Sequence, residues 1–144
     1  MDIGELRLQH AEIGRAADRL AELTAIPDKP TTVGAIRWHL ARLLMTHLAL
    51  EDRILYPALL QADDADVRAA TQTLQIDTGR LAEHFSLYMT AWSDDRIARE
   101  WPSFCRETHQ MLSTLRKRIE REEETLYPLA DQIRHPVRLN QRTG

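Results

Sequence analysis

The sequence predicts an all-α fold, specifically an antiparallel up-down bundle of four helices. Along four long segments, apolar residues recur at alternating spacings of three and four, which is typical of helices that bury one face. Only five glycines and six prolines interrupt the 144 residues, so long helices are expected. No segment shows a convincing alternation of apolar and polar residues that would indicate a strand. Four amphipathic helices with short connections are typical of a bundle.

The first predicted helix ends at the segment IPDKPTT, residues 26–32. Asp2 can cap its first turn, with Glu5 three residues later as the reciprocal partner of a capping box. The residues expected on its inward face are Ile3, Leu6, His10, Ile13, Ala17 and Leu20.

The second predicted helix starts at a capping threonine, Thr31 or Thr32, and ends at QADDAD, residues 61–66. Pro57 lies late in this helix and is expected to bend or end it, because proline lacks an amide donor and crowds the preceding turn. The residues expected on its inward face are Ile36, Leu40, Leu43, His47, Leu50 or Glu51, Ile54 and Ala58.

The third and fourth predicted helices are joined by WSDDRIAREWP, residues 92–102. Pro102 suits the first turn of the fourth helix, and Pro128 should affect its end as Pro57 does in the second. The third inward face is expected to contain Val67, Ala70, Leu74, Asp77, Leu81, His84, Tyr88 and Ala91. The fourth is expected to contain Phe104, Thr108, Met111, Leu115, Arg118, Glu122, Leu126, Leu129 and Ile133.

Length and composition predict a single domain over residues 1–135 and a polar tail over residues 136–144. The net charge of −3 gives no general attraction to nucleic acid or to an anionic membrane. No stretch is apolar enough to span a bilayer, and the N-terminus shows no apolar signal core. A single cysteine, Cys105, excludes an internal disulfide, so a cytoplasmic location is expected.

A short sequence motif occurs twice in the chain. The segment HLALEDRILYPAL begins at His47 and the segment RIEREEETLYPLA begins at Arg118. Aligned, they share a glutamate, Glu51 or Glu122, and the sequence Leu-Tyr-Pro after it, but histidine in the first copy is arginine in the second. The repeat predicts two related helical hairpins around an approximate twofold axis, with the two glutamates facing each other across the core.

Polar residues fall at mid-height on all four predicted inward faces. His47 and Glu51 are four residues apart and therefore share a helix face. A buried carboxylate without a partner costs several kcal/mol, so the glutamates need a compensating charge. Imidazole and carboxylate groups together suit iron, manganese or zinc, and bundle cores often hold such ligands. The polar residues are His10, His47, Glu51, Asp77, His84, Tyr88, Arg118 and Glu122.

The order and spacing of LQH, HLALEDRILYP, AEHFSLY and EREEETLYP resemble those of the hemerythrin-like, or HHE cation-binding, family. The resemblance covers about residues 1–133. It implies a non-haem di-iron centre between the helices, bridged by carboxylates and otherwise held by histidines, in proteins that bind dioxygen or nitric oxide, sense oxygen or redox state, or handle iron. Carried over to matching positions, the implied metal ligands are His10, His47, Glu51, His84 and Glu122.

Two departures from the family pattern indicate a reduced centre, with one ion or an incomplete pair. Arg118 stands where family members have a histidine, and the neighbours of His84 one turn away are Arg80 and Tyr88. His39 and His109 point away from the inward faces by about 80° and 180°, taking 100° per residue, so rim or surface positions are expected for both. Tyr88 is interpreted as a core tyrosine with a bonded hydroxyl rather than as an iron ligand.

Two main functions are consistent with this pattern. The first is a non-haem iron protein, more readily a sensor or carrier than an enzyme, that binds a small diatomic ligand or handles iron. Its signal would be read out by a protein partner or by a second copy of the chain. The alternative is a bundle without metal that serves as a regulatory interaction module. In that alternative the guanidinium of Arg118 pairs with Glu51, Glu122 or both and replaces the charge of the metal. Phosphotransfer through an exposed histidine, His39 or His109, ranks last.

Overall fold

The computed structural model describes residues 3–134 and is helical almost throughout. No strand occurs in this part of the chain, so the all-α prediction is confirmed for it. The predicted cap at Asp2 and the predicted tail at residues 136–144 lie outside the described residues. The elements are α1 (Ile3–Leu23), α2 (Gly34–Leu50), the π-helical turn η1 (Glu51–Leu55), α3 (Tyr56–Leu60), α4 (Ala65–Ala91), α5 (Asp94–Arg99), α6 (Trp101–Arg121), the π-helical turn η2 (Glu122–Leu126) and α7 (Tyr127–Arg134).

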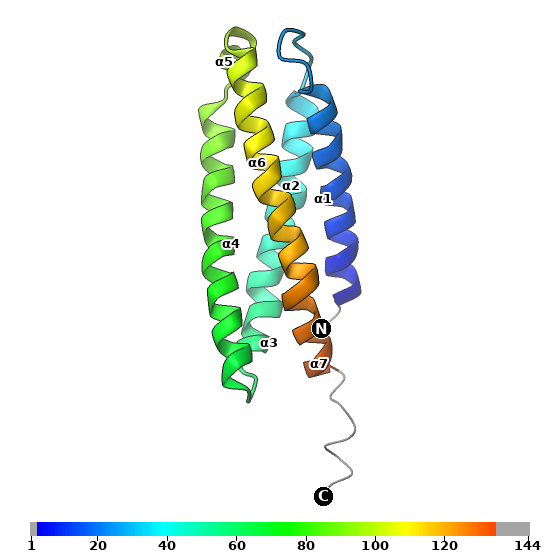
Figure 1. Ribbon diagram of the computed structural model, residues 1–144, viewed down its shortest axis with the longest axis vertical. Helices are drawn as coiled ribbons and strands as arrows, with labels where there is room; N and C mark the ends of the chain where they lie inside the picture. The colour runs from blue at the N-terminus through cyan, green and yellow to red at the C-terminus, as the bar shows by residue number, and fades with distance from the viewer. Residues whose placement is uncertain (1–2, 135–144) are drawn as a thin grey trace, which may run out of the picture.

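The long helices lie side by side along the long axis of the molecule (Figure 1). The runs α2–η1–α3 and α6–η2–α7 are continuous and pack with α1 and α4. Short connections reverse the chain at each end. The short helix α5 lies at the end of the molecule opposite to α3 and α7.

The connection at residues 92–102, expected to be a loop, contains the helix α5. The side chain of Ser93 accepts a hydrogen bond from the backbone of Arg96, which caps the helix, and Asp94 and Asp95 complement the positive end of its dipole. Ile97 anchors the helix in the core. At the start of α6, Pro102 occupies the first turn as predicted.

Neither predicted threonine caps α2. Val33 is the N-cap residue and makes no side-chain capping bond. The hydroxyl of Thr31 instead donates to the carbonyl of Leu23, at 2.8 Å, and so helps to complete the end of α1. The loop between the two helices therefore closes back on α1.

Two apolar clusters make up the core, and polar residues separate them along the chain. Leu6 belongs to one cluster and Ile13 to the other, with His10 between them in α1. In the same way, Leu115 and Leu126 fall on either side of Glu122. The bundle thus contains a buried polar layer between two apolar layers.

The prolines of the repeated motif follow the π-helical turns and do not break the helices. The amide of Tyr56 donates to the carbonyl of Glu51, and that of Tyr127 donates to the carbonyl of Glu122, five residues back in each case. Such a widened turn is often found at functional sites. It lets a proline start the next α-helical segment, where its missing amide donor costs little.

The widened turns also change which side chains face inward. In a regular α-helix, residues five apart differ by about 140° in direction; here Glu51 and Tyr56 are both buried, as are Glu122 and Tyr127. Ile54, which was expected to face inward, is 42% exposed. Among the described helices, none combines the length and apolar composition that a bilayer-spanning helix requires.

Candidate metal centre

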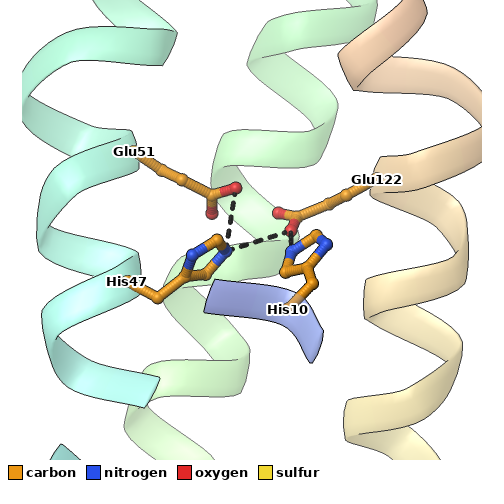
Figure 2. Close-up of side chains that lie close together, drawn as sticks. All are labelled: His10, His47, Glu51 and Glu122. Atoms are coloured by element: carbon orange, nitrogen blue, oxygen red, sulfur yellow. Dashed lines mark hydrogen bonds and ion pairs between the residues drawn. The ribbon is translucent and has the colours of Figure 1, made fainter. Parts of the chain in front are cut away.

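Four of the five predicted ligands meet at one point in the buried polar layer. One ligand atom from each of His10, His47, Glu51 and Glu122 lies within 4.8 Å of those of the others, and all four residues are buried. They come from α1, α2, η1 and η2, and their side chains point toward one another (Figure 2). The two glutamates face each other as the repeat predicted.

His47 lies between the two carboxylates. Its Nε2 atom is 3.2 Å from Oε2 of Glu51 and 3.6 Å from Oε1 of Glu122. The same Oε1 atom of Glu122 is 2.8 Å from Nε2 of His10. Two imidazole nitrogens therefore face the same pair of carboxylates (Figure 2).

The outer nitrogen of each histidine is held by an acceptor from outside the cluster. Nδ1 of His47 donates to Oε1 of Gln9 at 2.8 Å, and Nδ1 of His10 donates to Oε1 of Glu123 at 2.8 Å. These bonds fix both rings with Nε2 toward the centre. Metal-binding histidines almost always have such a partner on the other ring nitrogen, because it sets the tautomer and the ring orientation.

Tyr127 places a hydroxyl group in the same cluster. It donates to Oε2 of Glu51 at 2.9 Å and lies 3.0 Å from Nε2 of His10 and 3.4 Å from Nε2 of His47. Its ring stacks on that of His10, with centroids 4.9 Å apart. Burial, followed by the charges of Glu51 and Glu122, raises the pKa of the phenol well above its usual range.

The carboxylates are only partly satisfied by these contacts. Oε1 of Glu51 and Oε2 of Glu122 are buried and have no hydrogen-bond partner. An unpaired buried carboxylate oxygen is costly, and a cation is the group that two such oxygens and two imidazoles accommodate best. The residues present therefore fit a divalent metal ion.

The charged side chains of this layer shift one another's pKa values. Burial lowers the pKa of His47, but the hydrogen bonds with Glu122 and Glu51 outweigh burial and raise this pKa to about 9. Burial raises the pKa of Glu51 despite the hydrogen bond with His47. Burial also acts to raise the pKa of Glu122, but hydrogen bonds from His10 and His47 hold it below its ordinary range.

The prediction that His84 joins this cluster was wrong in its placement: His84 is exposed on α4. The buried face of α4 runs through Leu74, Thr78, Leu81, Phe85 and Tyr88, among others. The predicted face shared Leu74, Leu81 and Tyr88 but took the neighbouring residue at the positions between them. His84 therefore lies about 100° around the helix from Phe85, which is the residue that enters the core.

In its place, α4 offers a hydroxyl group. Thr78 is buried and lies 2.8 Å, between hydroxyl oxygens, from Tyr56. Tyr56 is the counterpart of Tyr127 in the repeated motif, yet the two equivalent tyrosines have different hydrogen-bond partners. Tyr127 meets two histidines and a glutamate, whereas Tyr56 meets a threonine. The two histidines of the cluster thus come from the first half of the repeat, and the second half contributes Glu122 and Tyr127.

Arg118 does not make the predicted pair with Glu51 or Glu122. Its Nη2 atom is 3.5 Å from Oδ2 of Asp77, and this is its ion pair among the described residues. The arginine reaches toward α4 and the surface, because Asp77 lies on the exposed side of the buried face of α4. The two glutamates keep their unpaired oxygens.

The predictions for His39, His109 and Tyr88 are confirmed, whereas Ala91 and Ile133, which were expected to face inward, are exposed. His39 and His109 are exposed, and His109 bonds to the hydroxyl of Thr24 at 3.0 Å. Tyr88 is buried with its hydroxyl 2.7 Å from that of Thr108, as expected for a core tyrosine.

Three residues of the site were not identified from the sequence: Gln9, Glu123 and Tyr127. Gln9 and Glu123 are next to predicted ligands in the chain and lie at the edge of the polar layer, where helical periodicity assigns them to the outer face. Tyr127 could have been found, because Leu-Tyr-Pro is the longest identical part of the repeat. Sequence reasoning did not predict the π-helical turn, and this turn directs Tyr127 inward.

Comparison with known proteins gives one match. The family model of the hemerythrin HHE cation-binding domain matches residues 1–130. Searches of curated proteins and of solved structures found no match.

Proposed function

The chain belongs to the hemerythrin HHE cation-binding family, and from that premise we propose that it is a non-haem iron protein with a reduced centre. The ion would be held by His10, His47, Glu51 and Glu122. The observation that carries this proposal is the fully buried cluster of these four residues, in which two carboxylate oxygens have no partner. Gln9 and Glu123 support it, since they orient the two imidazoles.

A single ion is favoured over a pair. The described residues supply one set of clustered ligands, and α4, which faces the second half of the repeat, contributes Thr78 and Phe85 rather than histidines. We also interpret the arrangement of α1, α2–η1–α3, α4 and α6–η2–α7 (Figure 1) as an antiparallel up-down bundle of the hemerythrin type, with α5 as an addition at one end.

The function that follows from such a centre is the binding of a small diatomic ligand, dioxygen or nitric oxide, or the handling of iron. Iron held by these residues would supply a coordination position for that ligand. The surrounding residues exclude water and fix the two imidazoles, and the hydroxyl of Tyr127 lies where it can donate to a group at the centre. We propose that a protein partner or a second copy of the chain reads out the bound state.

The alternative, a bundle without metal in which Arg118 neutralises the glutamates, loses its main support. The guanidinium pairs with Asp77, and the unpaired oxygens of both glutamates are still without a partner. In a bundle without metal, the compensating charge would come from protonated His47, whose pKa is raised to about 9, and not from Arg118.

The test is metal analysis of protein produced with added iron, together with absorption spectra before and after reduction. About one iron ion per chain is expected, because one set of ligands is present. The His47→Ala variant should lose the iron, and the His84→Ala variant, the matched control with an exposed histidine, should keep it. Protein without any transition metal, or equal loss in the two variants, would contradict the proposal.

Ligand binding is tested separately on the iron-loaded protein. Addition of nitric oxide to the reduced form should change the absorption spectrum, and the His47→Ala variant should show no such change. If the wild type binds iron but its spectrum is unaffected by nitric oxide and by dioxygen, iron handling is the function that the centre supports.

A further inference from the structure

A second group of charged side chains lies outside the metal centre, on the surface between α4 and α6. A cavity of about 450 Å³ opens there. Together with the neighbouring cavity described below, it forms what we call the α4–α6 groove. The charged and ionisable residues of the first cavity are Asp77, Arg80 and His84 from α4, and Lys117, Arg118 and Arg121 from α6.

The balance of charge in this cavity is strongly positive. Four arginine or lysine side chains line it against one carboxylate, although the chain as a whole has a net charge of −3. A concave surface lined by charges of one sign concentrates its field and attracts ions of the opposite sign. The groove is therefore a local exception to the overall charge of the protein.

Asp77 shows that the arginines already converge on an anionic group. Its carboxylate is 2.9 Å from Nη1 of Arg121, 3.5 Å from Nη2 of Arg118 and 3.8 Å from Nη1 of Arg80. One carboxylate carries a single negative charge, so three guanidinium groups around it leave an excess of positive charge. Lys117 adds a fourth cation on the same wall.

Arg118 has hydrogen-bonding capacity that Asp77 does not use. Its side chain is 11% exposed, and its Nε and Nη1 atoms are buried without a hydrogen-bond partner. Guanidinium donors left unpaired in this way destabilise the folded protein. Because these two atoms are buried, an anion in the cavity would gain from the positive charge of Arg118 and not from direct bonds to them.

A neighbouring cavity of about 490 Å³ extends the groove along the same two helices. His84 and Thr114 line both cavities, so the two spaces adjoin. The second cavity adds Ser103, Arg106 and Gln110 as donors and one carboxylate, that of Glu107, so cations still outnumber carboxylates in the whole groove. The groove has room for a ligand larger than a single phosphate ion.

We propose that the α4–α6 groove binds a small molecule that carries two or more phosphate groups. Guanidinium groups present paired donors that match phosphate oxygens, and a lysine acts as a point charge beside them. A phosphate group has oxygens in several directions, so it accepts bonds from arginines on different helices at once. The cavity volumes fall in the range of about 300–1,000 Å³ that is usual for small-molecule sites.

The test is calorimetric titration of the full-length chain with inorganic pyrophosphate, with citrate as a carboxylate probe. Lys117→Ala and Arg121→Ala should each weaken pyrophosphate binding by about tenfold, as expected for loss of one charge-assisted contact. Arg15→Ala is the matched control, because Arg15 is exposed on α1, outside the groove. It removes the same charge and should change the affinity by less than about twofold.

Asp77→Asn gives the sharpest result. It removes the carboxylate that competes for the arginines, so pyrophosphate should bind more tightly than to the wild type. If the arginines serve only to pair with Asp77, this variant will not gain affinity. Titration of the wild type in the presence of a metal chelator should give the same affinity for pyrophosphate, which excludes chelation at the metal centre.

Three outcomes would overturn the proposal. They are no saturable binding of pyrophosphate at millimolar concentrations, equal effects of Lys117→Ala and Arg15→Ala, and tighter binding of citrate than of pyrophosphate. Because Lys117 and Arg121 are exposed, circular dichroism should show that their variants fold normally. None of these results depends on whether iron is bound.

Discussion

The hydroxyl of Tyr127 donates a hydrogen bond of 2.9 Å to Oε2 of Glu51, a residue 76 positions earlier in the chain. Its oxygen also lies 3.0 Å from Nε2 of His10. This tyrosine therefore joins three of the long helical runs at the point where the candidate ligands meet. It adds a phenol hydroxyl to a centre that otherwise consists of histidine and glutamate side chains.

Replacing Tyr127 with phenylalanine should weaken both the fold and the centre. Glu51 already has one unpaired oxygen, and the variant would leave the other without its tyrosine donor. We expect the free energy of unfolding of the metal-free protein to fall by about 1–3 kcal/mol, measured by urea denaturation. Metal affinity should fall by about tenfold or more, as for other groups that hold ligands in place.

Tyr56→Phe is the matched control for this prediction. It removes the equivalent hydroxyl of the repeat, which bonds to Thr78 instead of the cluster. It should lower stability by a similar amount and leave metal affinity unchanged. Equal metal affinities in the two variants would show that the hydroxyl of Tyr127 does not act on the centre.

Replacing Glu123 with alanine should reduce metal affinity although Glu123 is not a predicted ligand. Its carboxylate accepts a hydrogen bond from Nδ1 of His10, and loss of such a partner typically costs about 10- to 100-fold in metal affinity. Glu124→Ala is the control, because Glu124 is the exposed neighbour in the chain. Competition with a chelator measures both. If Glu124→Ala is as harmful as Glu123→Ala, the effect is one of overall charge.

Stability of the metal-free protein should fall as the pH rises from 6.5 to about 9. The pKa of His47 is raised from 6.5 to about 9 in the folded state. Its contribution is therefore fully present below pH 6.5 and is lost as the pH rises through the folded value. The raised pKa of Glu51 acts in the same direction in its own, more acidic range. Urea denaturation in the presence of a chelator measures the trend.

Metal affinity should change with pH in the opposite sense. Ligand histidines must lose their protons to bind an ion, so affinity should increase across the window in which the metal-free protein loses stability. His47→Gln removes the titrating group and should flatten the stability curve of the metal-free protein. A wild-type curve that rises between pH 6.5 and 9, or an unchanged slope in His47→Gln, would rule out His47 as the proton-binding group.

Restoring a histidine at position 118 should not by itself add a second ion. Arg118→His supplies one imidazole, but the neighbouring buried positions of α4 are Thr78, Leu81 and Phe85, and none of these side chains has a ligand atom suited to iron. Iron content should stay near that of the wild type. Arg121→His, an exposed position on the same helix, is the control. A doubled iron content in Arg118→His alone would contradict this view of α4.

The family resemblance selected the four residues that meet in the polar layer, and helical periodicity was sufficient to predict that layer and the long helices. It failed on α4 for a definite reason. Spacings of three and four are both compatible with a helix face, so either His84 or Phe85 could lie on the same face as Leu81 and Tyr88. The prediction placed His84 there. Packing decides the choice, since Phe85 is completely buried. The more apolar of the two neighbours was the better guide.

The partner of Arg118 was also predicted from the position of the residue in the repeat, without regard to the length of its side chain. Its long side chain extends to Asp77 on α4, a contact between residues 41 positions apart that no local pattern indicates. The sequence showed that arginine stands in the second copy of the repeat where the first copy has histidine. It did not show that the guanidinium pairs with Asp77 and not with the two glutamates.

The π-helical turn at Glu122–Leu126 makes the centre depend on chain length as well as on residue type. Its hydrogen bond spans five residues, one more than in a regular helix. Deleting a single residue such as Glu124 would leave Glu122 and Tyr127 four residues apart, which is the spacing that shares a face in a regular α-helix. The same deletion within α6 would instead rotate Glu122 and everything after it by about 100° relative to the preceding residues. The turn is therefore the place in this run of helix where the loss of one residue disturbs the centre least.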